Sequence, residues 1–76
     1  MAWIRMEAQK GSYQGKQQYD GVCEELDDLA AEVTNGYAAC NGSRYVLAPG
    51  SGVICTEDGK IHFKQSDGSW SGVSDD

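Results

Sequence analysis

The stretch that decides the fold is VICTEDGKIHFKQSDGSW, at residues 53–70. It contains two Asp-Gly pairs, Asp58-Gly59 and Asp67-Gly68. Asp-Gly is typical of tight turns, because glycine adopts a positive φ without a steric penalty. Residues 53–56 are β-branched and apolar, and residues 60–64 alternate with the period of a strand. Two turns that enclose one strand predict an antiparallel β-meander.

The same alternation predicts which side chains face the core. Ile61 and Phe63 are expected to face inward, whereas Lys60, His62 and Lys64 are expected to face water. Further strands are expected on either side of this segment. Residues 45–48 precede the turn pair Pro49-Gly50, and residues 70–73 can form a last strand.

Residues 21–34 have the pattern of an amphipathic helix. The apolar stripe consists of Val22, Leu26, Leu29, Ala30 and Val33. Asp20 is expected to be the N-cap, because its carboxylate can accept from the free N–H groups of the first turn. Asn35-Gly36 predicts a left-handed stop. The predicted fold class is therefore α+β, with one amphipathic helix packed on a small three- to four-stranded antiparallel β-meander.

The N-terminal part of the chain has weaker signals. Residues 2–8 alternate loosely and predict a short strand, with Ile4, Met6 and Ala8 on one side. Residues 9–19 are polar, contain glycine and lack periodicity, which indicates an extended or mobile arm. A chain of 76 residues is one domain, divided into a strand and polar arm at 1–19 and the helix with the meander at 20–76.

The net charge is −6, and it is unevenly distributed. Residues 20–33 contain no base, and their acids are Asp20, Glu24, Glu25, Asp27, Asp28 and Glu32. Without a basic stripe the chain is not expected to bind nucleic acid, and an anionic membrane is disfavoured for the same electrostatic reason. The acids would complement a basic protein surface, or they form a solvated helix face that keeps the chain soluble.

The cysteine and histidine residues do not predict a metal site or a cofactor site. The chain contains an odd number of cysteines, namely Cys23, Cys40 and Cys55. Residues 1–7 do not resemble an export signal. Reduced, buried thiols in the cytoplasm are therefore expected rather than disulfides. His62 is the only histidine and has no cysteine near it in sequence.

Catalytic residues are not expected either. His62 with Glu57 or Asp58 could perform acid–base chemistry, but the alternation predicts an exposed, solvated histidine. Cys23 would lie in the acidic helix, where the carboxylates raise the pKa of its thiol and make it a weaker nucleophile. The sequence therefore predicts a protein that is not an enzyme.

Aromatic and charged side chains are the remaining candidates for function. Trp3 is expected at a sheet edge, where another chain can add a strand, and Tyr13 and Tyr19 can anchor the arm on a surface. The predicted partner-binding residues are Trp3, Arg5, Tyr13, Tyr19, Glu24, Asp27 and Asp28.

Residues 50–70 resemble small proteins of bacteriophage and prophage virion gene clusters. The shared pattern is a glycine–serine turn, an apolar strand, an Asp-Gly turn, a strand ending in an aromatic residue, and a D-G-x-W close. A short acidic helix like residues 24–29 often precedes it. That family usually has a proline-containing link after the helix, whereas this chain has Thr34-Asn35-Gly36, and residues 1–19 are not covered.

The resemblance implies a non-enzymatic virion accessory or structural protein that docks on a capsid, connector or tail component, in the virion or the host bacterial cytoplasm. Its partner would be a virion structural protein or a second copy of itself, which gives a homo-oligomer. An alternative is a small acidic protein that binds and regulates a host protein by presenting carboxylates to a basic groove.

Overall fold

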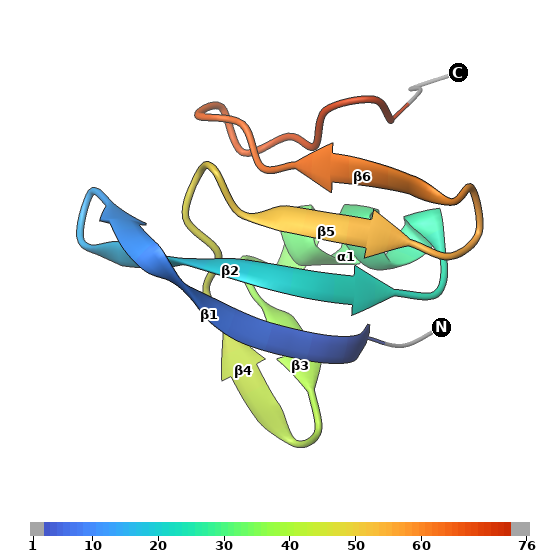
Figure 1. Ribbon diagram of the computed structural model, residues 1–76, viewed down its shortest axis with the longest axis horizontal. Coiled ribbons are helices and arrows are strands. Elements are labelled where there is room, and N and C mark those ends of the chain that lie inside the picture. Colours follow the sequence, from blue (N-terminus) through green and yellow to red (C-terminus); the bar gives the residue numbers. More distant parts are fainter. Residues whose placement is uncertain (1–2, 74–76) are drawn as a thin grey trace.

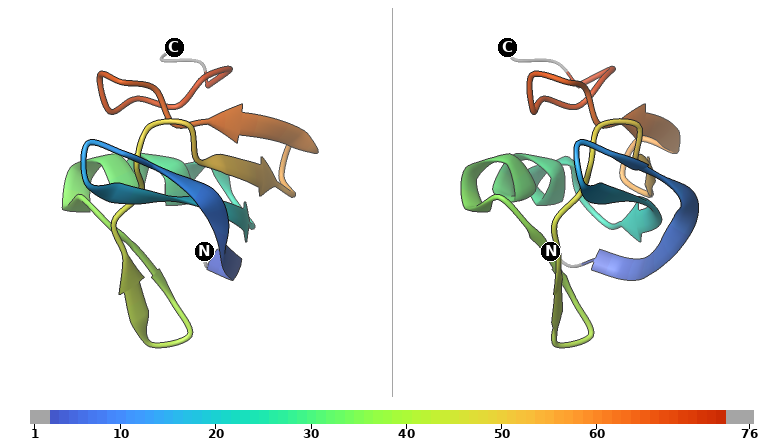
Figure 2. Two further views of the ribbon diagram at one scale, coloured as in Figure 1. Left: turned by 60° about the vertical axis from the view of Figure 1, so that its left-hand side comes forward. Right: turned by 90° about the vertical axis from the view of Figure 1, so that its left-hand side faces the viewer.

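A four-stranded sheet with one helix on one of its faces forms the body of the molecule in the computed structural model (Figures 1 and 2). The structure describes residues 3–73, without the side chains of residues 9 and 10. Its elements in chain order are β1 (Trp3–Tyr13), β2 (Lys16–Cys23), α1 (Leu26–Asn35), β3 (Ala38–Cys40), β4 (Ser43–Tyr45), β5 (Gly52–Cys55) and β6 (Lys60–Phe63).

The sheet has the strand order β1-β2-β5-β6. The outer pairs β1–β2 and β5–β6 are antiparallel hairpins, whereas β2 and β5 run parallel. The short hairpin β3–β4 forms a separate ribbon that projects from one side of the sheet (Figure 1). An α+β fold with one helix and a mostly antiparallel sheet is therefore confirmed. The sequential meander is not confirmed, because β2 and β5 are joined through α1 and the β3–β4 hairpin.

Only part of the predicted strand pattern matches the observed strands. The turn at residues 57–59 does join the antiparallel strands β5 and β6. Of residues 45–48, only Tyr45 lies in a strand, and after β6 the chain makes a single bridge between Lys64 and Trp70. The segment that follows β6 is thus a loop folded back on the sheet edge.

The helix begins five residues later than predicted, and Asp20 is not its N-cap. Helix α1 starts at Leu26, after an extended Glu25 with φ −132° and ψ 152°. Asp20 instead lies in β2 and pairs with Gly52 of β5. The strand is favoured there because it can hydrogen-bond to β1 and β5 at once, and because Gly21 is a poor helix former. The end was predicted correctly, since Gly36 has a left-handed φ of 82°.

The segment expected to be an extended or mobile arm is a regular hairpin. Tyr13 pairs with Lys16 across a tight turn in which Gln14 and Gly15 both have positive φ, 53° and 79°. Such a turn matches the right-handed twist of the two strands. The sequence did not predict this hairpin, because its residues are mostly polar and neither of its faces has an apolar period.

The core lies between the sheet and α1. Its buried residues are Cys23, Leu29, Ala38, Leu47, Val53, Cys55 and Trp70. The predicted orientation of β6 is wrong: His62 is 1% exposed, whereas Ile61 and Phe63 are 57% and 52% exposed. The reason is register, because Val53 faces the core and pairs with His62, which places both side chains on the same face.

Replacing Gly36 by alanine should lower the free energy of unfolding by about 1 kcal/mol, because a Cβ is unfavourable at positive φ. Gly36→Asn is the matched control and should cost less, since asparagine tolerates this conformation. Urea unfolding followed by circular dichroism measures both. Equal stability of the alanine variant and the parent would contradict the left-handed helix end.

Candidate protein interface

The face of the sheet opposite α1 has no element packed on it within residues 3–73, and we call it the open face (Figure 2). The strand register arranges its side chains in two parallel rows. The Arg5 row consists of Arg5, Val22, Ile54 and Ile61. The Glu7 row consists of Glu7, Asp20, Gly52 and Phe63. Both rows continue across all four strands.

The open face is apolar over β5 and β6. Ile54 is 41% exposed, and Ile61 and Phe63 are more exposed still. The ring of Phe63 lies over Gly52, where an added Cβ would come within 3.2 Å of the ring atom Cε1. Glycine at this position therefore leaves room for the aromatic ring. Over β1 and β2 the same face is charged, and the side chains of both rows line one shallow groove.

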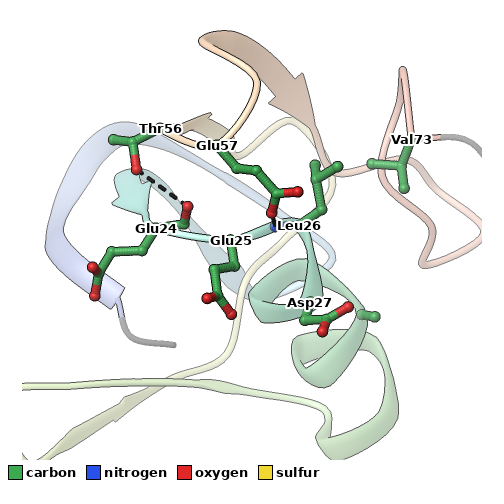
Figure 3. Close-up of a pocket in the computed structure, with 8 residues that line it drawn as sticks. Glu24, Glu25, Leu26, Asp27, Thr56, Glu57 and Val73 are labelled. Carbon is green, nitrogen blue, oxygen red and sulfur yellow. Dashed lines mark hydrogen bonds between the residues drawn. The ribbon is translucent and has the colours of Figure 1, made fainter.

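A second surface surrounds the N-terminus of α1, and we call it the acidic rim. Its residues are Glu24, Glu25, Asp27 and Glu57, around a hollow that Leu26, Ala30, Thr56 and Val73 also line (Figure 3). Glu57 Oε1 accepts the N–H of Leu26 at 2.9 Å, which satisfies one of the free donors of the first helical turn. The Thr56 hydroxyl donates to the carbonyl of Glu24 at 3.2 Å. These bonds hold the β5–β6 turn against the helix start.

The aromatic residues predicted to bind a partner do not form one site. Trp3 is half-buried in the edge strand β1 and packs against the core. Tyr13 is 43% exposed at the end of the β1–β2 hairpin. Tyr19 is half-buried, and its ring meets Tyr45 edge-on with centroids 5.3 Å apart.

The predicted charged residues separate into three places. Arg5 lies on the open face, and the exposed Glu24 and Asp27 lie together on the acidic rim. Asp28 is 3% exposed and accepts the backbone N–H of Glu25 at 3.0 Å, so it stabilises the helix start from inside the fold. Carboxylates of one helix thus serve two different purposes.

Sequence reasoning missed Ile54, Ile61 and Phe63 as surface residues. The alternation in β6 was read correctly but assigned to the wrong face of the sheet. The signal that could have corrected it lies in β5, where Val53, Ile54 and Cys55 are apolar without alternation. A strand that is apolar on both faces indicates that both faces of its sheet carry apolar side chains.

Polar and charged groups are also buried between α1 and β6. Glu32 is 2% exposed, and one of its carboxylate oxygens accepts from Trp70 Nε1 at 3.1 Å and from Lys64 Nζ. The ammonium group of Lys64 lies 5.4 Å from the centroid of the Trp70 ring. Glu32 therefore ties the helix to the C-terminal end of β6 and to the loop that follows.

His62 is buried in the same layer and has a partner at each ring nitrogen. The expectation of an exposed, solvated histidine is therefore wrong. Nε2 of His62 is 3.0 Å from Asp58 Oδ2, and Nδ1 is 2.7 Å from the carbonyl oxygen of Ser71. The Ser71 carbonyl can only accept, and the pKa of the Asp58 carboxyl lies below its usual range. The main cause is the hydrogen bond from the Lys60 backbone N–H, and the contact with His62 adds to it.

The three cysteines are buried, as expected, and their thiols are free. Cys23 lies at the end of β2 rather than in the helix, and it pairs with Cys55 of β5. Burial, followed by the neighbouring Cys55, raises the pKa of the Cys23 thiol far above its ordinary value. This thiol is a core residue and a poor nucleophile.

Within residues 3–73, no three His, Cys, Asp or Glu side chains are grouped so that they could hold a metal ion. Helix α1, the single helix of this part of the chain, is too short and too polar to cross a bilayer. The chain matches no protein family model, no curated protein and no solved structure.

Replacing Lys64 by methionine should lower the free energy of unfolding by about 3 kcal/mol, because Glu32 then keeps a buried charge without its cation. The double variant E32Q/K64M should recover at least half of that loss, since the glutamine oxygen still accepts from Trp70. Urea unfolding measures both. A single variant as stable as the parent would show that the pair is solvated rather than buried.

The contact between Asp58 and His62 should stabilise the fold less at acid pH. A group whose pKa is lowered by folding stabilises the folded state above its unfolded pKa, and this contribution is lost as the pH falls through the folded value. The Asp58→Asn variant should therefore be less stable than the parent at about pH 7 and approach it at about pH 2.5. Urea midpoints of both chains over this range provide the measurement. A constant difference would contradict the role of the ionised carboxylate.

Proposed function

We propose that this protein is a non-enzymatic accessory or structural protein of a bacteriophage or prophage virion, which docks on a capsid, connector or tail component. The observation that carries protein binding is the open face, whose apolar residues Ile54, Ile61 and Phe63 lie side by side with nothing packed on them within the described chain. The virion setting is supported by the resemblance of residues 50–70 to proteins of virion gene clusters.

Docking through the open face has a direct physical reason. Contiguous exposed apolar side chains mark interaction sites, because burying them stabilises a complex by about 25 cal/mol for each Å² removed from water. The charged half of the face, over β1 and β2, adds specificity, since Arg5 and Glu7 favour partner groups of opposite charge.

The reactive groups of the chain support a role without catalysis. Both ring nitrogens of His62 are engaged by Asp58 and Ser71, and the side chain is almost fully buried. The thiols of Cys23, Cys40 and Cys55 are buried as well. The groups best suited to acid–base or nucleophilic chemistry thus stabilise the fold.

The acidic rim favours a second candidate, a regulator that binds a basic groove of one host protein. Its carboxylates are gathered at the N-terminus of α1. Binding of that kind would depend steeply on salt, because exposed charges are screened over a Debye length of about 8 Å at physiological ionic strength. Docking through the apolar open face would change little with salt.

Particles purified from the producing cell should contain the protein at a fixed ratio to the major virion proteins, as measured by quantitative mass spectrometry. Ile61→Asp should remove it from the particles by placing a charge on the open face. Val33→Asp is the matched control and should remain particle-bound, because Val33 is similarly exposed, at 48%, but lies on α1. Absence of the parent from particles, with salt-sensitive binding to one host protein, would favour the regulator instead.

A further inference from the structure

The two rows of the open face are opposite in charge over β1 and β2 and are both apolar over β5 and β6. In the Arg5 row, the part over β1 and β2 carries a cation, and the part over β5 and β6 carries Ile54 and Ile61. In the Glu7 row, the first part carries two carboxylates, Glu7 and Asp20, and the second carries the Phe63 ring lying on Gly52. A row of one copy can therefore face the other row of a second copy with opposite charges together and apolar groups together.

We propose that the open face binds the open face of a second copy of this chain, around a twofold axis that runs between the two rows. This inference rests on the proposed function and names its partner: the virion component that binds the open face is a second copy of the chain. The axis lies between the two sheets and is perpendicular to the strands. It places each strand over its own counterpart, running in the opposite direction, so that the Arg5 row of each copy meets the Glu7 row of the other.

This arrangement pairs opposite charges over β1 and β2, and apolar side chains over β5 and β6. Arg5 of one copy meets the carboxylates of Glu7 and Asp20 of the other, and Ile54 and Ile61 meet the Phe63 ring. By symmetry each contact occurs twice. Sheets that pack face to face lie about 10 Å apart with their strands within about 30° of each other, which keeps these neighbours within reach.

Other arrangements of two copies satisfy fewer groups. A twofold axis along the strands would put the charged β1 of one copy over Ile61 and Phe63 of the other. Pairing of two edge strands β1 would also bring Arg5 to Glu7, but it would leave Ile54, Ile61 and Phe63 exposed. Of these arrangements, only the row-on-row one covers the apolar half and also brings Arg5 to the carboxylates of the other copy.

The net charge of −6 does not prevent this association. The acids of α1 lie on the other side of the sheet from the open face (Figure 2). Their repulsion across the proposed interface is screened at physiological salt, where the Debye length is about 8 Å. The open face itself brings one cation and two carboxylates from each copy.

Sedimentation equilibrium of the purified chain, from about 1 μM to about 1 mM, tests the proposal. The parent should be a dimer at the upper end of this range. Ile61→Asp should raise the dimer dissociation constant at least about a hundredfold, and Arg5→Glu about tenfold. The double variant R5E/E7R should recover most of the loss, because it exchanges the two charges across the axis.

The matched control is again Val33→Asp, which adds the same charge on α1 and should dimerise like the parent. Circular dichroism and thermal unfolding show that each variant is folded, which is expected because Arg5, Val33 and Ile61 are all exposed. A parent that is monomeric at every concentration overturns the proposal. So does an Ile61→Asp variant that dimerises normally, because this result indicates pairing of β1 edges.

The two proposals fail separately. A monomeric parent that is still removed from particles by Ile61→Asp leaves the virion function standing and overturns the dimer. A dimer that is lost on Ile61→Asp, in a protein absent from every particle, supports the dimer and overturns the virion function.

Discussion

The parallel pairing of β2 with β5 is the constraint on which the rest of the structure depends. Parallel neighbours cannot be joined by a tight turn, so the chain between Cys23 and Gly52 must cross one face of the sheet. That crossover contains α1 and the β3–β4 hairpin, and it covers only the face that presents Val53 and Cys55. The opposite face carries the alternate residues of the same strands. An uncovered and partly apolar face is therefore a consequence of the topology and of strand β5, which is apolar on both sides.

The covered face presents polar groups from β6, and they require partners. His62 and Lys64 point toward the helix layer, where water cannot satisfy them. Glu32 of α1 accepts hydrogen bonds from Lys64 and Trp70. The Asp58 carboxylate and the Ser71 carbonyl contact the two ring nitrogens of His62. Every buried polar side-chain atom in the described residues has a hydrogen-bond partner. The helix is thus fixed in place partly by directional bonds, which specify one position more strictly than apolar contact does.

Local patterns predicted what depends on local chemistry. The Asp58-Gly59 turn, the alternation in β6 and the helix stop at Gly36 could all be read from the chain, because each depends on a few neighbouring residues. Pairings distant in sequence could not. Asp20 and Val22 fit the helical spacing, but strand β5, some thirty residues later, holds them in the sheet. The open face could not be predicted for the same reason. Which side of β6 is buried depends on its register with β5 and on the face of the sheet that the crossover covers. Of the predicted binding residues, Arg5 alone reaches that face.

The exposure of Ile61 and Phe63 is held by the fold, and it is not an accident of pairing. A slip of β6 by one residue would turn these side chains into the core and return His62 and Lys64 to water. The β5–β6 turn opposes this slip, because the Gly59 N–H bonds to the Cys55 carbonyl at 2.8 Å and Lys60 N–H bonds to Asp58 Oδ1 at 3.0 Å. Glu32 opposes it again, since a slip would remove its cation. The polar contacts on the covered side therefore keep the apolar residues on the open side, where a second protein surface can bury them.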